Sequence, residues 1–101
     1  MPSGTAEALN LPLPPYSTEH FQRALGFVLR ALRRRSGLTQ EQAAAEAGMD
    51  RPHLGHWEQG RFDPQTYRLA RLIGVYDYPF AEAMEWIERR ARYYYNLERR
   101  R

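Results

Sequence analysis

The stretch that decides the fold is residues 33–61, RRRSGLTQEQAAAEAGMDRPHLGHWEQGR, which holds two short segments with helical signals. Thr39 opens the first segment with a hydroxyl that can cap a helix, and Gln42, three residues later, completes a capping-box pattern. Gly48 is the residue type that ends a helix in a left-handed conformation. The pattern therefore predicts a short helix from Thr39 to Ala47.

The second segment predicts another short helix directly after that glycine. Asp50 can cap its start, and Pro52 is tolerated because first-turn amides have no partner within the helix. The helix is expected to end at Gln59-Gly60. Two short helices joined by a tight glycine-bearing turn form a helix-turn-helix unit, which needs a small residue where the helices cross. Ala44 is placed to be that residue.

A longer helix is expected before this unit, preceded by an extended arm. Residues 1–16 are rich in proline and cannot form a stable helix. Leu9, Leu11 and Leu13 point to one side of that arm, which is either a mobile tail or an arm that lays these leucines on the domain or on a partner chain. Ser17 or Thr18 then caps a helix that should end near Ser36-Gly37. Its apolar stripe contains Phe21, Leu25, Val28, Leu29 and Leu32.

Two further helices are expected after the unit. Asp63-Pro64 opens a fourth helix, and a fifth runs from about Pro79 to near Arg99. The fourth has an apolar face that includes Tyr67, Leu69, Ala70, Leu72 and Ile73. The predicted fold class is all-α: an extended arm at 1–16, a helix-turn-helix domain at 17–76 and an amphipathic C-terminal helix at 77–101.

Composition narrows the function classes. With 101 residues, 43% apolar and 27% charged, the chain fits one small domain, and it has no apolar run of membrane length and no signal-peptide pattern. Zero cysteines exclude disulfides and thiolate chemistry. The net charge is +3 and every basic residue is Arg, which suits a polyanionic partner but equally follows from a GC-rich genome. The expected compartment is the cytoplasm, with the protein associated with the nucleoid.

Many positions at fixed spacing resemble the lambda-repressor-like helix-turn-helix family, also called the Cro/repressor or xenobiotic-response-element type. The resemblance covers roughly residues 20–76. Its quoted residues are Arg33 to Ala44, Ala47-Gly48-Met49, Leu54, Trp57-Glu58-Gln59-Gly60-Arg61 and Pro64. This resemblance implies a five-helix DNA-binding domain and a regulator of transcription that binds double-stranded DNA, expected to be a repressor that excludes polymerase.

The resemblance also implies roles for individual residues. The helix 51–59 would be the recognition helix, with Leu54 and Trp57 facing the core. The side facing the major groove would be formed by Arg51, Pro52, Gly55 and His56. The DNA backbone would be contacted by Gln40, which could alternatively reach an outer base pair, and by His53 and Arg61. Arg33 and Glu58 would form a buried structural ion pair.

Gly55 departs from what a helix interior favours. Glycine there costs about 0.5–1 kcal/mol relative to alanine. Either Gly55 permits a close approach to DNA or base reading at this position is poor. Arg51 is the residue expected to read a guanine.

The C-terminal segment has a heptad rhythm. Its apolar seam contains Phe80, Met84, Ile87, Ala91 and Tyr94, and a second side is formed by Trp86, Arg90, Tyr93 and Leu97. The prediction is a homodimer with Phe80, Met84, Ile87 and Tyr94 in its interface, because domains of this size usually read palindromic sites as pairs. The alternative is that the seam packs only on its own domain.

Two other function classes compete with DNA reading. One is a protein-interaction module, such as an antitoxin or accessory factor, that binds a protein partner through the aromatic C-terminal helix. The other is an enzyme, suggested only by His53 and His56 with Asp50 and Asp63 nearby. These residues lack a third placed metal ligand, and no nucleophile is paired with a base. The sequence therefore predicts no enzyme, no metal, no cofactor and no membrane partner.

Overall fold

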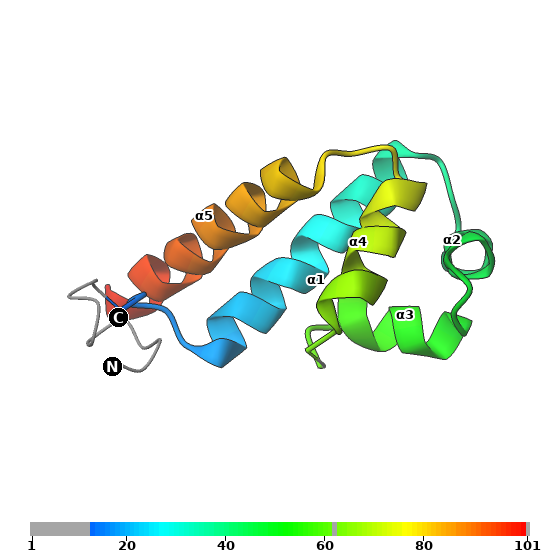
Figure 1. The fold of residues 1–101 in the computed structure, drawn as a ribbon. Helices are drawn as coiled ribbons and strands as arrows, with labels where there is room; N and C mark the ends of the chain where they lie inside the picture. The colour runs from blue at the N-terminus through cyan, green and yellow to red at the C-terminus, as the bar shows by residue number, and fades with distance from the viewer. Residues whose placement is uncertain (1–12, 62, 101) are drawn as a thin grey trace, which may run out of the picture.

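A computed structural model of the chain describes residues 13–61 and 63–100, and within these ranges all regular structure is helical. The helices are α1 (Thr18–Arg35), α2 (Gln40–Ala47), α3 (Arg51–Glu58), α4 (Thr66–Val75) and α5 (Phe80–Arg99). In Figure 1, α1 runs through the middle of the molecule with α5 along one side and α2 and α3 toward the other. The all-α prediction is confirmed.

The first two helices begin where their capping residues predict. Ser17 caps α1, accepting a hydrogen bond from the His20 amide, and the His20 ring nitrogen Nδ1 accepts the Ser17 amide at 3.0 Å. Thr39 and Gln42 form the reciprocal pair at the start of α2, with Gln42 Oε1 accepting the Thr39 amide at 2.9 Å. Gly48 ends α2 with a φ of 69°, a left-handed conformation that glycine adopts without strain. Local capping chemistry therefore sets these boundaries.

The start and the inner face of α4 differ from the prediction. The chain stays extended through Gln65, whose carbonyl accepts the first helical bond from Leu69, so α4 begins at Thr66 and not at Asp63-Pro64. Tyr67 is 76% exposed and does not belong to the apolar face. The buried residues of this segment are Leu69, Leu72, Ile73 and Tyr76. Their spacing of three and four leaves a residue two positions before Leu69 on the opposite side of the helix.

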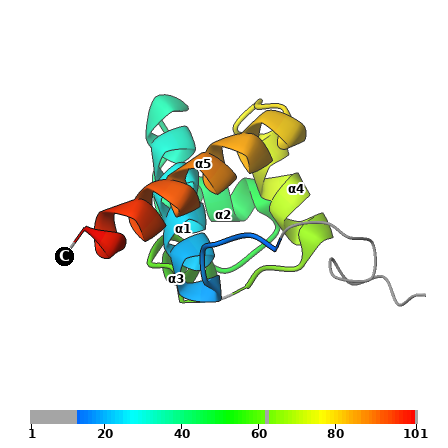
Figure 2. The ribbon, with the colours of Figure 1, turned by 90° about the vertical axis from the view of Figure 1, so that its left-hand side faces the viewer.

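The core forms around α1, which contacts both α3 and α5. The largest fully buried side chains come from α1, α3, α4 and α5: Trp57, Leu25, Leu29, Leu32, Leu54, Leu72, Ile73, Ile87 and Val28. Figures 1 and 2 show α5 lying along α1 with the opposite chain direction, so the end of α5 meets the start of α1. At that end, His20 Nε2 lies 2.6 Å from Glu98 Oε2.

Gly26 allows α1 and α3 to approach closely. A Cβ at this position would clash with the carbonyl oxygen of Glu58 and would lie 3.0 Å from that of Trp57. The backbone at the end of α3 therefore rests directly on α1. This contact fixes the position of α3, because backbone atoms cannot rotate away as side chains can.

The predicted dimer seam on the C-terminal helix requires correction. Ile87 is fully buried and Tyr94 nearly so, both as part of this chain's own core, so neither is available to a second chain. Phe80 and Met84 are partly buried against the same core. The seam has the heptad rhythm because α5 packs along α1, which demands the same spacing as pairing between chains.

The described end of the N-terminal arm contacts the domain through Tyr16. Its ring stacks on Phe21 with 6.3 Å between centroids, and its hydroxyl donates to Glu88 Oε2 at 3.3 Å. Leu13 is exposed, while Leu9 and Leu11 lie outside the described residues. No helix in the described part of the chain is long and apolar enough to cross a bilayer.

Candidate nucleic-acid interface

The outward face of α3 presents most of the residues predicted to read bases. Arg51, Pro52 and His53 are exposed, while Gly55 and His56 are half-buried. The opposite side of the helix is anchored by Leu54 and Trp57, both buried. An eight-residue helix held by two large apolar side chains and by backbone contact with α1 is a rigid platform for the face it exposes.

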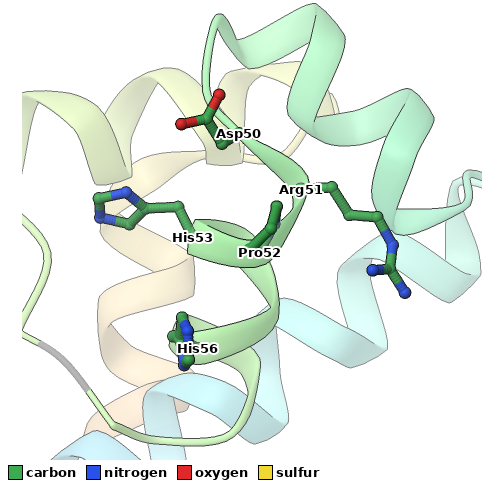
Figure 3. A pocket seen from close by; sticks show the side chains of 5 residues that line it. All are labelled: Asp50, Arg51, Pro52, His53 and His56. Atoms are coloured by element: carbon green, nitrogen blue, oxygen red, sulfur yellow. The ribbon is translucent and has the colours of Figure 1, made fainter.

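An open hollow of about 580 Å³ lies on this face, lined by Asp50, Arg51, Pro52, His53 and His56. Figure 3 shows Pro52 in the middle, with Arg51 extending to one side and His53 to the other, and His56 one turn further along. The guanidinium of Arg51 supplies donors in a planar fork, and the Pro52 ring supplies an apolar surface. The two imidazoles add ring nitrogens that can donate or accept. Such a set suits the edges of bases and phosphate oxygens.

Arg33 and Glu58 are brought together beneath this face. Arg33 Nε donates to Glu58 Oε2 at 2.7 Å and Nη2 donates to Oε1 at 3.0 Å, while Nη1 donates to the Leu38 carbonyl at 3.0 Å. Glu58 is only 3% exposed. The hydrogen bonds to Glu58 raise the pKa of Arg33 despite its partial burial. This bidentate pair joins α1 to the end of α3 and to the turn before α2.

Gln40 is tied to the same carboxylate. Its Nε2 donates to Glu58 Oε1 at 3.1 Å, so this amide links the first residue of α2 to α3. A Cβ placed on Gly55 would lie 3.7 Å from Gln40 Oε1, which puts the Gln40 amide beside the glycine. The sequence indicated a contact with DNA for Gln40 but not this internal bond. Its carbonyl oxygen takes no part in the bond to Glu58.

The remaining predicted backbone contacts are exposed. His53 lies with its ring edge against Trp57, with 5.7 Å between ring centroids. Arg61 follows the left-handed Gly60 and donates its amide to the His56 carbonyl at 3.0 Å. Arg61 is therefore held next to the end of α3 by its backbone while its side chain reaches outward.

Two residues beside the ion pair were missed by sequence reasoning. Arg30 Nη2 donates to the Glu58 carbonyl at 3.0 Å and so caps the end of α3. Its spacing of one helical turn from Arg33 was the available signal. Tyr76 is buried nearby, and burial, followed by the charge of Glu58, raises its pKa well above the usual value. Nothing in its local sequence indicates that position.

No group of three or more potential metal ligands occurs among residues 13–61 and 63–100. His53 and His56 therefore share the hollow with Asp50 without forming a metal-binding cluster. A zinc site needs three or four protein ligands in a tetrahedral arrangement. The geometry of this face fits recognition of a surface better than metal chemistry.

Comparisons with known proteins agree with this geometry. A sequence model described as a helix-turn-helix domain matches residues 24–95. An uncharacterised helix-turn-helix-type transcriptional regulator of Sinorhizobium fredii, y4dJ, is 37% identical over 57 residues, covering 54% of this chain and 74% of the relative.

Solved structures share the fold. The clp gene regulator ClgR of Corynebacterium glutamicum superposes with a TM-score of 0.73 at 22% identity, covering 77% of this chain and 83% of that one. The restriction-modification controller protein C.Esp1396I gives 0.63 at 18% identity, covering 69% and 92%. That controller protein has also been solved as a tetramer in complex with its natural 35 base-pair operator.

Proposed function

This chain belongs to the helix-turn-helix domain family, and from that premise we propose that it is a sequence-specific regulator of transcription that binds double-stranded DNA with α3 in the major groove. The observation that carries the proposal is the outward face of α3, where exposed Arg51, Pro52 and His53 surround an open hollow while Leu54 and Trp57 anchor the helix. The matched family is one of DNA-binding domains and not of enzymes.

Each base-reading residue has a distinct role in this proposal. Arg51 donates both arms of its fork to O6 and N7 of a guanine. His56 donates to a purine acceptor, and Pro52 contacts a thymine methyl group. Gly55 contributes no side chain, so DNA can approach the helix backbone there, as support from its open surroundings indicates.

Phosphate contacts set the register of the protein on the duplex. His53 and Arg61 are exposed on the two sides of α3's C-terminal half and reach phosphate oxygens. Gln40 uses one amide hydrogen for Glu58 and offers its second to a phosphate, so the same side chain is both oriented by α3 and available to DNA. Such contacts provide affinity without sequence information.

We propose further that the protein acts in the cytoplasm, at the nucleoid, as a repressor that occludes promoter DNA, and that it does so as a homodimer. The fold relative that has been solved as a tetramer on its operator supports an oligomeric mode of binding. Two copies related by a twofold axis place two α3 helices about 34 Å apart, the spacing of successive major grooves.

The test is fluorescence-anisotropy binding to duplex DNA from upstream of the protein's own gene, with a scrambled duplex as control and titrations from low to physiological salt. We expect the native duplex to bind at least about a thousandfold more tightly at physiological salt. Arg51→Ala is expected to lower specific affinity by about 1–3 kcal/mol while leaving non-specific binding nearly unchanged.

The matched control is Arg92→Ala, which removes the same charge from an exposed position on α5 and breaks only an exposed ion pair with Glu88. It should leave the ratio between the two duplexes unchanged. Equal binding of both duplexes that disappears at physiological salt would refute base reading. Retention of regulatory function by Arg51→Ala would favour an interaction module in its place.

A further inference from the structure

We propose that a stripe on α5, formed by Trp86, Arg90, Tyr93 and Leu97, pairs with the same stripe of a second copy in antiparallel orientation. This inference rests on the proposed function as a dimeric regulator and assigns it a different surface from the seam that the sequence indicated. The name α5 stripe is used below for these four residues.

The α5 stripe has the spacing of a helix-pairing surface. Its members follow each other at intervals of four, three and four residues, as do the a and d positions of a heptad. The stripe runs beside the buried residues Ala83, Ile87, Ala91 and Tyr94, which are already occupied by packing within the chain. Tyr93 and Leu97 are 48% and 38% exposed, among the most exposed large hydrophobic residues described. α5 thus carries a second apolar line without a partner in its own chain.

Contacts with α1 hold the stripe in place before any partner arrives. The Arg90 guanidinium lies 3.8 Å from the centre of the Phe27 ring and 4.7 Å from that of Tyr93, and its Nε donates to the Tyr94 hydroxyl at 3.2 Å. Trp86 meets Phe27 edge-on with 6.4 Å between centroids. Side chains already ordered in the free protein lose little entropy on binding, which favours association.

Charge order along α5 selects a second copy in antiparallel orientation. The exposed acidic residues Glu82, Glu85 and Glu88 precede the exposed arginines Arg89, Arg92, Arg99 and Arg100. When Trp86 of one copy is set opposite Leu97 of the other, Glu82 comes opposite Arg100 of the second copy, and the relation holds in both directions. Glu82 and Arg100 are 18 residues, about five full turns, apart, so both lie on the same side of the stripe.

A parallel pair would instead set Glu82 against Glu82 and Arg100 against Arg100, which is unfavourable. A surface that complements itself about a twofold axis is the condition for a closed dimer. In Figure 1, α5 lies on the far side of α1 from α3, so this pairing leaves both recognition faces uncovered.

Cysteine cross-linking tests surface and orientation together, because the natural chain contains no cysteine. The double variant Glu82→Cys/Arg100→Cys is expected to form a covalent dimer on oxidation, seen on a non-reducing gel. The two positions are about 27 Å apart along one helix and cannot be bridged within a chain. Either single variant should stay uncross-linked. Cross-linking of Glu82→Cys alone would overturn the antiparallel orientation, and failure of the double variant to cross-link would overturn the α5 stripe as the interface.

Light scattering at micromolar protein gives an independent readout of the same proposal. The unmodified chain should have twice the mass of 11.9 kDa, and Leu97→Glu should return it to the monomer with unchanged helical circular dichroism. Leu13→Glu is the matched control, since it places the same charge on a leucine 60% exposed outside the stripe, and it should stay dimeric. A monomeric unmodified chain, or a Leu97→Glu chain that remains dimeric, would overturn the proposal.

The two proposals fail in different ways. If α3 does not read bases, Arg51→Ala leaves DNA binding unchanged while the mass and the cross-link still report a dimer. If the α5 stripe is not the interface, the cross-link fails while Arg51-dependent discrimination between duplexes persists. Binding of the α5 stripe to an unrelated protein by a monomeric chain would likewise overturn self-pairing.

Discussion

At the scale of single residues, Glu58 organises the recognition helix. It is a buried carboxylate that accepts two hydrogen bonds from Arg33 and one from Gln40, and its own backbone carbonyl accepts one from Arg30. A buried charge is tolerated only when its hydrogen-bonding capacity is met by partners of opposite charge. One side chain thereby connects α1, α2 and α3 under the surface that we propose contacts DNA.

Loss of one partner should expose the cost of that buried charge. We expect Arg33→Ala to lower the free energy of unfolding by about 3–5 kcal/mol, because Glu58 would remain buried without its main counter-charge. Urea unfolding followed by circular dichroism measures the change. The double variant Arg33→Leu/Glu58→Leu removes both charges and should recover most of the loss. A loss below about 1 kcal/mol in Arg33→Ala would show that the pair is effectively solvated.

At the scale of elements, glycines in two helices have opposite roles. Gly26 in α1 is required because any side chain there would meet the backbone of α3. Gly55 in α3 has no such neighbour, since an added Cβ would be in ordinary contact with the Gln40 amide only. Gly74 in α4 has nothing within 4 Å of an added Cβ. The absence of packing at Gly55 points outward, to what binds α3, as the reason for a glycine.

Gly55→Ala should therefore separate stability from recognition. We expect it to raise the free energy of unfolding by about 0.5–1 kcal/mol, because alanine favours the helix, and to lower specific DNA affinity roughly tenfold by keeping the duplex away from the backbone. Thermal unfolding and anisotropy titration on the same samples measure both. Gly74→Ala should give the same stabilisation with no change in affinity. Equal DNA binding by Gly55→Ala would show that the duplex does not approach α3 at this position.

At the scale of the whole molecule, α5 belongs to the same core as the helix-turn-helix unit. Ala83, Ile87, Ala91 and Tyr94 are buried together with residues of α1, and the family match extends to residue 95. The division between a domain at 17–76 and a separate C-terminal helix therefore does not correspond to a division of the core. A small domain has little buried apolar area to lose.

A chain truncated after Tyr76 is expected not to fold by itself. Removing α5 exposes the α1 surface that it covers, and the loss of several buried side chains at about 2–5 kcal/mol each exceeds the stability typical of a domain this size. Circular dichroism during heating would show a broad, non-cooperative change instead of a sigmoidal transition. Cooperative unfolding of the truncated chain near the melting temperature of the full chain would contradict this expectation.

Helix boundaries and fold class were accessible from the sequence because they depend on local chemistry. Ser17, Thr39 and Gly48 end or begin helices through hydrogen bonds and backbone conformations within a few residues of themselves. The inward face of α3 was also accessible, since Leu54 and Trp57 are its large apolar residues. The start of α4 and the exposure of Tyr67 were not, because an aromatic residue fits an apolar pattern until the neighbouring helices show which side is covered.

By itself, the sequence determined where the helices lie, that they are joined in a helix-turn-helix order, and which residues α3 can present. Tertiary structure alone decided that Gln40 bonds to Glu58, that Arg30 caps α3, and that Ile87 and Tyr94 face α1 and not a second chain. The physical reason is that capping and periodicity act between residues close in the chain. Contacts between residues 18 or more positions apart depend on how the helices cross, which no local pattern records.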